Sequence, residues 1–248
     1  MTQDYESLRD SALIGLKQYM DTLDSDKGKK LAYWIKDYTR FLSLESSFQP
    51  QKLIRYKRGA IVKVHLGYRI GSEEGGLHYA VVMDKNNSLY SPILTVIPLT
   101  SIKNGVDLSK HQASNVPLGS EIYSILSTNL SAEIRSAKQH LADSNKLLAT
   151  LPNQTDEEFA LIEETIKAQH TEIKKQLAYC QKMQTEVNKM KVGSIALVGQ
   201  ITTISKLRVY DPRYKGDALA KVRVSNATLD KLDAKIVELF TCSTNNKQ

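Results

Sequence analysis

The order of apolar and polar positions divides the chain into a helical start, a group of short strands, a long helical middle and a mixed end. Within residues 4–48, apolar side chains recur at helical spacing on both sides of Asp24-Ser25-Asp26. Because these three side chains are favourable helix caps, we expect a pair of helices here, ended by Pro50. The apolar face of the second helix must pack on the rest of the protein or on a partner subunit.

Short runs rich in β-branched residues follow, with turn residues between them. They predict strands over residues 59–67, 78–84 and 93–100, with a weaker strand near 116–123. Residues 192–209 return to the strand pattern, and residues 225–242 have the period of a last helix. The chain is therefore expected to belong to the α+β class.

Residues 124–191 differ from both neighbouring segments, because they contain no glycine and are rich in Ala, Glu, Gln and Lys. Their apolar residues recur at helical steps, interrupted by Pro152-Asn153 and then by a helix-start signature from Thr155 to Glu158. We expect an antiparallel helical hairpin, a short coiled coil, inserted between strands. Since the ends of a hairpin lie close together, a sheet can accept it without losing its pairing.

Candidate chemistry gathers around the first three expected strands. A glycine-rich loop with two carboxylates, Glu73 and Glu74, joins the first pair of strands, and His78 follows it. The third strand ends in Thr100 and Ser101. A flexible backbone, a carboxylate, an imidazole and a hydroxyl group are typical of chemistry on a phosphate. Each side chain also has an ordinary alternative role, as a solvated loop residue or a hydroxyl that caps its own strand.

These residues resemble the MazF/PemK family, the ribonuclease half of bacterial toxin–antitoxin pairs. The resemblance covers roughly residues 55–120 and 190–242. It is carried by Arg58-Gly59, the loop 71–76, the strand from Tyr79 to Val82, Thr100-Ser101, and a block from Gly193 to Lys206 that contains Gln200. Two blocks in the family's order are more specific than one glycine-rich loop.

The resemblance implies a small SH3-like β-barrel of the MazF/PemK/CcdB type, decorated by the helical segments. We expect an N-terminal helical extension over residues 1–50 and the inserted helical hairpin over 124–191. The barrel, with its C-terminal helix, would then consist of residues 51–123 and 192–248.

The resemblance also implies an activity: a toxin-like, metal-independent endoribonuclease that cuts single-stranded RNA at short motifs, without a cofactor, through attack of the 2′-hydroxyl. The implied catalytic residues are His78, Glu73 and Thr100. Glu73 or His78 would take the 2′-hydroxyl proton, His78 would assist the phosphate or the leaving oxygen, and Thr100 would hold the phosphate. Glu74 is an alternative to Glu73. The residues expected to bind RNA are Arg58, Gly75, Gly76, Ser101, Lys206 and Arg208.

The chain departs from the family at some of these positions. The family usually has arginine where this chain has His78, which exchanges protons better but, when neutral, holds a phosphate less well. The Kid-like branch has Arg-x-Asp before the late glutamine, where this chain has Leu197-Val198-Gly199. Two alternatives therefore stay open: a non-catalytic barrel that binds RNA or protein, and a structural protein assembled through its helices.

Composition and charge indicate which kinds of partner the protein has. The chain has 34 Lys and Arg against 27 Asp and Glu, a net charge of +7, which favours an anionic partner such as RNA. By resemblance, a cognate antitoxin and a second copy of the chain are further partners. Cys180 and Cys242 are expected to be free thiols, and no Cys/His spacing indicates zinc. Without a leader-like or membrane-spanning segment in the sequence, we expect a cytoplasmic protein and no membrane.

Overall fold

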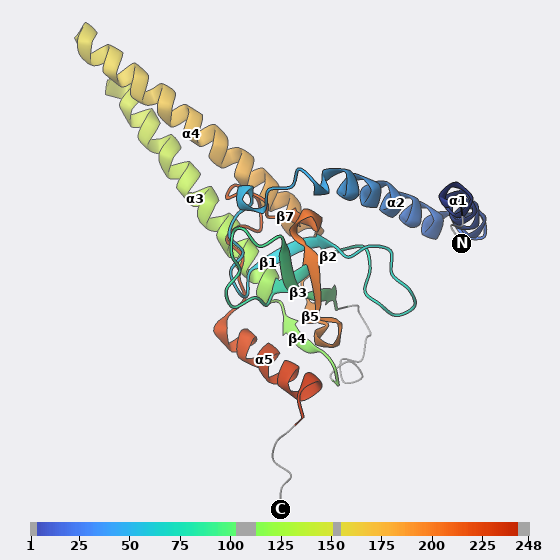
Figure 1. Cartoon of the computed structure of the whole chain (residues 1–248). Coiled ribbons are helices and arrows are strands. Elements are labelled where there is room, and N and C mark those ends of the chain that lie inside the picture. The colour runs from blue at the N-terminus through green and yellow to red at the C-terminus, as the bar shows by residue number, and fades with distance from the viewer. Residues whose placement is uncertain (1–3, 103–112, 151–154, 243–248) are drawn as a thin grey trace, which may run out of the picture.

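The computed structural model of the protein describes residues 4–102, 113–150 and 155–242. Helices begin and end the described chain, and a strand region between them is interrupted by a pair of long helices (Figure 1). The helices are α1 (Tyr5–Asp21), α2 (Ser25–Glu45), α3 (Glu121–Thr150), α4 (Asp156–Lys189) and α5 (Asn226–Phe240). The strands are β1 (Ile61–His65), β2 (Leu77–Val82), β3 (Ile93–Ser101), β4 (Val116–Gly119), β5 (Ser194–Ala196), β6 (Thr202–Ser205) and β7 (Val209–Asp211).

The helix starts follow the capping residues of the sequence. The Asp4 side chain accepts from the amide of Glu6, Asp24 accepts from the amides of Asp26 and Lys27, and Ser225 caps α5 in the same way. The helix α3 begins at Glu121. Residues 121–123 are therefore helical, and the weaker strand expected near 116–123 ends earlier because its last residues join the helix.

The strands form one antiparallel sheet in the order β4-β5-β3-β2-β1-β7, and β6 also pairs with β3. The long strand β3 makes this possible, since its first part pairs with β6, its middle with β2 and its last part with β5. Among the described residues, β4 and β7 at the two ends of the order are not paired with each other. The α+β class is confirmed. The described strands form an unclosed sheet, so closure into the expected SH3-like β-barrel is not seen among them.

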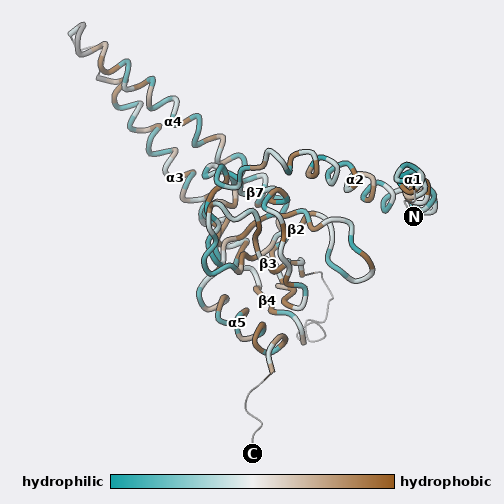
Figure 2. Tube along the Cα trace, viewed as in Figure 1, coloured by the Kyte–Doolittle hydropathy of each residue, from teal (hydrophilic) through white to brown (hydrophobic). Residues whose placement is uncertain are grey.

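Each face of the sheet has its own apolar core, because successive side chains of a strand point to opposite faces. Ile61 of β1 belongs to the core shared with α3, α4 and α5, whereas its neighbour Val62 belongs to the core on the other face. Leu126 of α3 and Met183 of α4 are fully buried in the first core. The strand region in Figure 2 is accordingly the most apolar part of the trace.

The helices α3 and α4 lie side by side and project from the sheet (Figure 1). The hydroxyl of Ser144 donates to Gln169 at 2.6 Å, and His140 lies 3.0 Å from Gln176. Because the residue number falls on α3 as it rises on α4, the two helices run antiparallel. The turn expected to join them includes residues 151–154, which lie outside the described residues.

A polar contact fixes the end of α4 to the sheet. The carboxylate of Glu186 accepts from the ammonium of Lys63 at 2.6 Å and also from the hydroxyl of Tyr79. Lys63 belongs to β1 and Tyr79 to β2, so one side chain of α4 binds both strands next to the candidate site.

Candidate functional site

The glycine-rich loop between β1 and β2 is closed by its own backbone. The amide of Leu66 donates to the carbonyl of Gly76, and the amide of Gly76 donates to the carbonyl of Gly67, both at 2.7 Å. Gly76 has a φ of +87°, and a Cβ atom on Gly75 would lie 2.9 Å from the carbonyl oxygen of Gly67. These glycines were expected to approach RNA. Here their backbone closes the loop, and the amide of Gly76 is not free for a phosphate.

His78 of β2 lies between two oxygen acceptors. Its Nδ1 is 3.1 Å from the carbonyl oxygen of Leu99 on the neighbouring strand, and its Nε2 is 3.0 Å from a carboxylate oxygen of Glu74. A carbonyl oxygen can only accept, so Nδ1 carries a proton. The strand contact thus fixes the ring, and Nε2 is the atom that can exchange a proton with the carboxylate or with a substrate.

The carboxylate at His78 belongs to Glu74, and not to Glu73. The Glu73 side chain is 59% exposed, and its carboxylate lies 3.6 Å from the guanidinium of Arg69. Adjacent residues of the loop point in different directions, which is why only one of them reaches the imidazole. We therefore assign the carboxylate role at this ring to Glu74, the alternative that the sequence left open.

Gln200 holds the loop in this arrangement. Its side-chain oxygen accepts from the amide of Glu74 at 2.6 Å, and its side-chain nitrogen donates to the carbonyl of Ser72 at 3.3 Å. Both ends of the amide are used, so Gln200 positions the carboxylate that faces His78. The sequence contained a signal for this residue, because Gln200 is part of the second block of the family resemblance, but no role followed from that.

On one side of His78 is a cavity of about 200 Å³ that we call the β3 pocket. Thr100 and Ser101 line it, so the structure brings His78 and the expected hydroxyl groups to one place. Lys189 and Lys191, at the end of α4, line it as well. Sequence reasoning missed these cations, because they come close to Thr100 only through the pairing of β5 with β3.

On the other side of His78 is a larger cavity of about 510 Å³ that we call the α2 pocket. The loop residues and the end of β1 form one wall of this pocket, and α2 forms the other. Its lining residues are Lys30, Tyr33, Trp34, His65, Gly67, Tyr68, Arg69, Glu73, Gly75, Gly76, Leu77 and His78. His78 therefore borders both cavities, together with its neighbour Leu77.

Two cations expected to bind RNA have partners within the chain. Arg58 pairs with Asp233 of α5 and with the carbonyl of Met83, at the end of β2 opposite His78. Lys206 is 1% exposed, and its ammonium donates to the carbonyl of Ser88 at 2.9 Å. Burial lowers the pKa of Lys206. In this conformation Lys206 is enclosed by the protein, whereas Arg58 stays partly exposed with its guanidinium bound to two partners within the chain.

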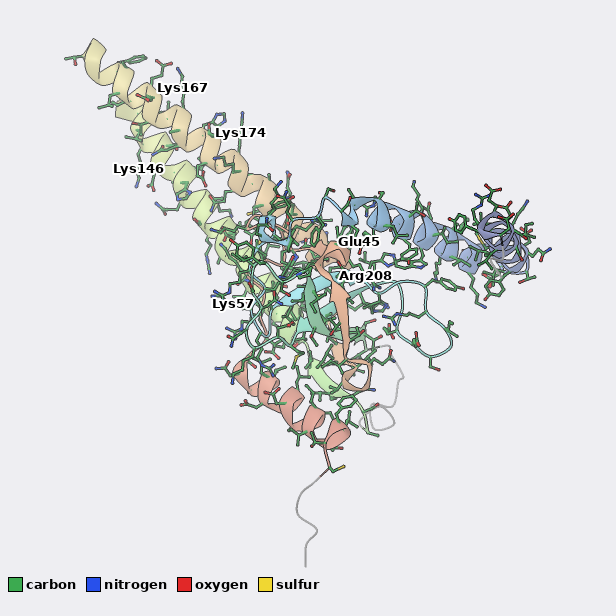
Figure 3. All side chains as sticks on the ribbon, viewed as in Figure 1. Glu45, Lys57, Lys146, Lys167, Lys174 and Arg208 are labelled. Carbon is green, nitrogen blue, oxygen red and sulfur yellow. The ribbon has the colours of Figure 1, made fainter. Side chains whose placement is uncertain are left out.

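The third expected cation, Arg208, lies beside the sheet near α2 (Figure 3). Its guanidinium donates to the carbonyl of His65 at 2.7 Å and lies 5.6 Å from the ring centre of Trp34. Burial lowers the pKa of Arg208, and nearby Arg69 adds to this. Arg208 therefore supports the wall of the α2 pocket and does not line it.

Within the described ranges, no cluster of three or more His, Cys, Asp or Glu side chains has the geometry of a metal site. In the same part of the chain, no helix combines the length and apolar character that crossing a membrane requires.

Comparison with models of protein families gives a match. The family model described as PemK-like, MazF-like toxin of type II toxin–antitoxin systems matches residues 57–170. That range includes β1 to β4, all of α3 and the first part of α4, whereas β5, β6 and β7 follow it although they pair in the same sheet. A search of curated proteins finds no match. The match at residues 57–170 supports assignment of this segment, a little under half of the chain, to the PemK-like, MazF-like toxins of type II toxin–antitoxin systems.

Proposed function

We propose that the protein is a toxin-like endoribonuclease that cleaves single-stranded RNA through attack of the 2′-hydroxyl, without a metal ion. The match of residues 57–170 to a toxin family supports this class of activity. The observation that carries the proposal is the position of His78 between the carboxylate of Glu74 and the β3 pocket. Its Nε2 lies 3.0 Å from the Glu74 carboxylate, and its ring borders a pocket that also presents hydroxyl groups and lysines.

The scissile phosphate would bind in the β3 pocket. There, the ammonium groups of Lys189 and Lys191 offset the charge of the phosphate, and the hydroxyl groups of Thr100 and Ser101 donate to its oxygens. These two lysines thus supply positive charge that remains after His78 has given up its proton.

The proposed reaction is one displacement at phosphorus. Glu74 takes the proton of the 2′-hydroxyl, the 2′-oxygen forms a bond to phosphorus, and the bond from phosphorus to the 5′-oxygen breaks. His78 gives a proton to the leaving 5′-oxygen through Nε2. The products are a 2′,3′-cyclic phosphate and a 5′-hydroxyl. Glu73, expected to act as the base, faces Arg69 and is left out of these steps.

The test is incubation of an unstructured RNA with the protein in excess chelator, followed by mass spectrometry of the RNA ends. Wild type should produce cyclic phosphate ends, and His78→Ala should produce none. His170→Ala, which changes an exposed histidine of α4, is the matched control and should cleave like wild type. Intact RNA with wild type, or equal cleavage by His78→Ala, would contradict the proposal.

Because this chain has histidine where the family usually has arginine, a second candidate is a non-catalytic barrel that binds RNA or protein. Saturable binding with intact RNA throughout would favour it. As partners we propose single-stranded RNA, a cognate antitoxin protein and a second copy of the chain. An RNA target of this kind would place the activity in the cytoplasm. The division into an N-terminal extension, a barrel and an inserted hairpin stays a prediction.

A further inference from the structure

We propose that α2 and the loop between β1 and β2 form a subsite for one base of single-stranded RNA, in the α2 pocket. The position of this base next to a scissile phosphate rests on the proposed function, whereas the binding of the base itself does not. The helix α2 lies outside the segment that matches the toxin family, so one wall of this subsite is not part of the matched segment, whereas the loop that forms the other wall is.

The size and composition of the pocket suit a nucleotide. Its volume of about 510 Å³ is within the range of small-ligand sites, roughly 300–1,000 Å³. Lys30 and Arg69 offer positive charge at its walls, and Tyr33 and Tyr68 offer aromatic rings. Cations with aromatic side chains are the combination that binds single-stranded RNA, because phosphates are neutralised while bases stack.

The aromatic side chains differ in how firmly they are held. The Trp34 ring is stacked on His65, with ring centres 4.8 Å apart, and on Tyr38 at 5.4 Å. Tyr33, the preceding residue, is 68% exposed. The fixed indole of Trp34 can form a rigid wall beside a bound base, and the exposed ring of Tyr33 is accessible for the base to stack on. We therefore assign the main stacking contact to Tyr33.

The pocket is continuous with the candidate catalytic residues. His78 lines both the α2 pocket and the β3 pocket, so a base in the first and a phosphate in the second would belong to neighbouring parts of one strand. Glu73 lines the α2 pocket beside Arg69. Its exposed carboxylate can accept from the amino group of a base, which gives this residue a role in recognition in place of the catalytic one expected for it.

Trp34 allows a direct measurement, because it is the only tryptophan of the chain. A short, unstructured RNA with 2′-O-methyl groups on every ribose cannot be cleaved by 2′-hydroxyl attack. Titration of the full-length protein with this RNA should quench the fluorescence of Trp34 in a saturable way. Tyr33→Ala should weaken this binding about 5- to 150-fold, the range expected for loss of one stacked base.

Two controls separate stacking from charge. Tyr19→Ala removes a tyrosine of α1 that is 51% exposed and does not line the pocket, and it should bind like wild type. An abasic oligonucleotide of the same length should bind at least 5-fold more weakly than the RNA and should not distinguish Tyr33→Ala from wild type. Equal binding of the abasic and base-bearing oligonucleotides would overturn the proposal.

The outcomes also separate this proposal from the proposed function. Quenching that depends on Tyr33, in a protein that leaves unmodified RNA intact, supports the base subsite and contradicts the nuclease. Cleavage of unmodified RNA by wild type, without quenching and with an unchanged KM in Tyr33→Ala, supports the nuclease and overturns the subsite. Quenching by protein ligands but not by RNA also overturns it, because the pocket then serves a protein partner.

Discussion

The two helical additions to the sheet, α1 with α2 and α3 with α4, are both amphipathic but are attached very differently. The long pair buries Leu126 and Met183 completely in a core that it shares with the sheet. Within the N-terminal pair, Leu31 is the one buried residue among those described. Apolar turns of α1 and α2 stay outside both cores (Figure 2). An apolar stripe therefore predicts a helix without telling what covers it.

The difference extends to polar contacts. The long pair is fixed by the partly buried contact of Glu186 with Lys63 and Tyr79. By contrast, α2 meets the sheet through the stacking of Trp34 on His65 and through Asp37, whose carboxylate lies 3.8 Å from Nε2 of His65. We infer that α3 and α4 unfold with the sheet, whereas α2 can open locally, since few buried contacts hold it.

The largest effect is expected from Glu186→Ala. The change leaves the Lys63 ammonium and the Tyr79 hydroxyl without their partner at a site where both ionic side chains are largely buried. Removal of one member of a buried pair costs about 3–5 kcal/mol. Urea unfolding should show a loss of this size. The control Glu163→Ala removes an exposed pair with Lys167 on the same helix and should cost about 0.5 kcal/mol or less.

Similar losses of stability in Glu186→Ala and Glu163→Ala would contradict the comparison of the two helical pairs. The contact of Glu186 with the sheet would then be no stronger than a surface ion pair.

Asp211→Asn should have a smaller effect, with a clear pH dependence. Burial raises the pKa of Asp211 from 3.8 to about 6, and the nearby carboxylates of Asp217 and Glu186 add to this. A raised pKa in the folded state means that stability is lost as pH rises from about 4 to about 6. Asn keeps the acceptor for the amide of Leu219 without the charge. At pH 7 the variant should therefore be more stable by on the order of 1 kcal/mol, and at pH 4 this gain should disappear.

Urea unfolding at pH 7 and at pH 4 measures this change in stability. The control is Asp217→Asn, for which the opposite change is expected at pH 7. Burial of Asp217 opposes its ionisation, but the amides of Tyr214 and Arg213 outweigh burial and lower its pKa. Removal of that charge should destabilise the protein at pH 7. A pH-independent gain in Asp211→Asn would refute the assignment to this carboxyl group.

The attachment of α2 should respond to pH in the opposite direction. Burial lowers the pKa of His65 below its ordinary 6.5, although Asp37 acts against this. The neutral Nδ1 accepts from the amide of Gly67 at 3.1 Å, and protonation would remove this contact. Stability present above pH 6.5 is therefore lost as the pH falls below it, by under about 1 kcal/mol.

Trp34 stacks on His65, so its emission should shift to the red between pH 7 and pH 5 while hydrogen exchange in α3 stays unchanged. In His65→Gln this shift should vanish. A shift that persists in the variant would place the titrating group elsewhere.

The sequence was a good guide to elements and a poor one to side-chain partners. Periodicity predicted the helices and most of the strands, and the family resemblance identified the loop with His78. The choice between Glu73 and Glu74 depends on Gln200, which holds the loop from 126 residues away. Lys206 has the pattern of a surface cation, yet it donates to Ser88, 118 residues away. Contacts between residues this far apart in the sequence decide whether a side chain is buried and where it points. Local sequence patterns do not contain this information.

The smallest effect is expected from Leu13→Ser on α1. Leu13 is 59% exposed, and serine is only a slightly weaker helix former, so the free energy of unfolding should change by about 0.5 kcal/mol or less. Leu126→Ser, at a fully buried position of α3, is the matched substitution in the other helical pair and should cost several-fold more. Unfolding should be followed at two protein concentrations at least tenfold apart. If Leu13→Ser is strongly destabilising, and more so in the concentrated sample, the α1 face is covered by a second copy in solution. In that case the contrast between the two helical pairs belongs to the isolated chain and not to the assembled protein.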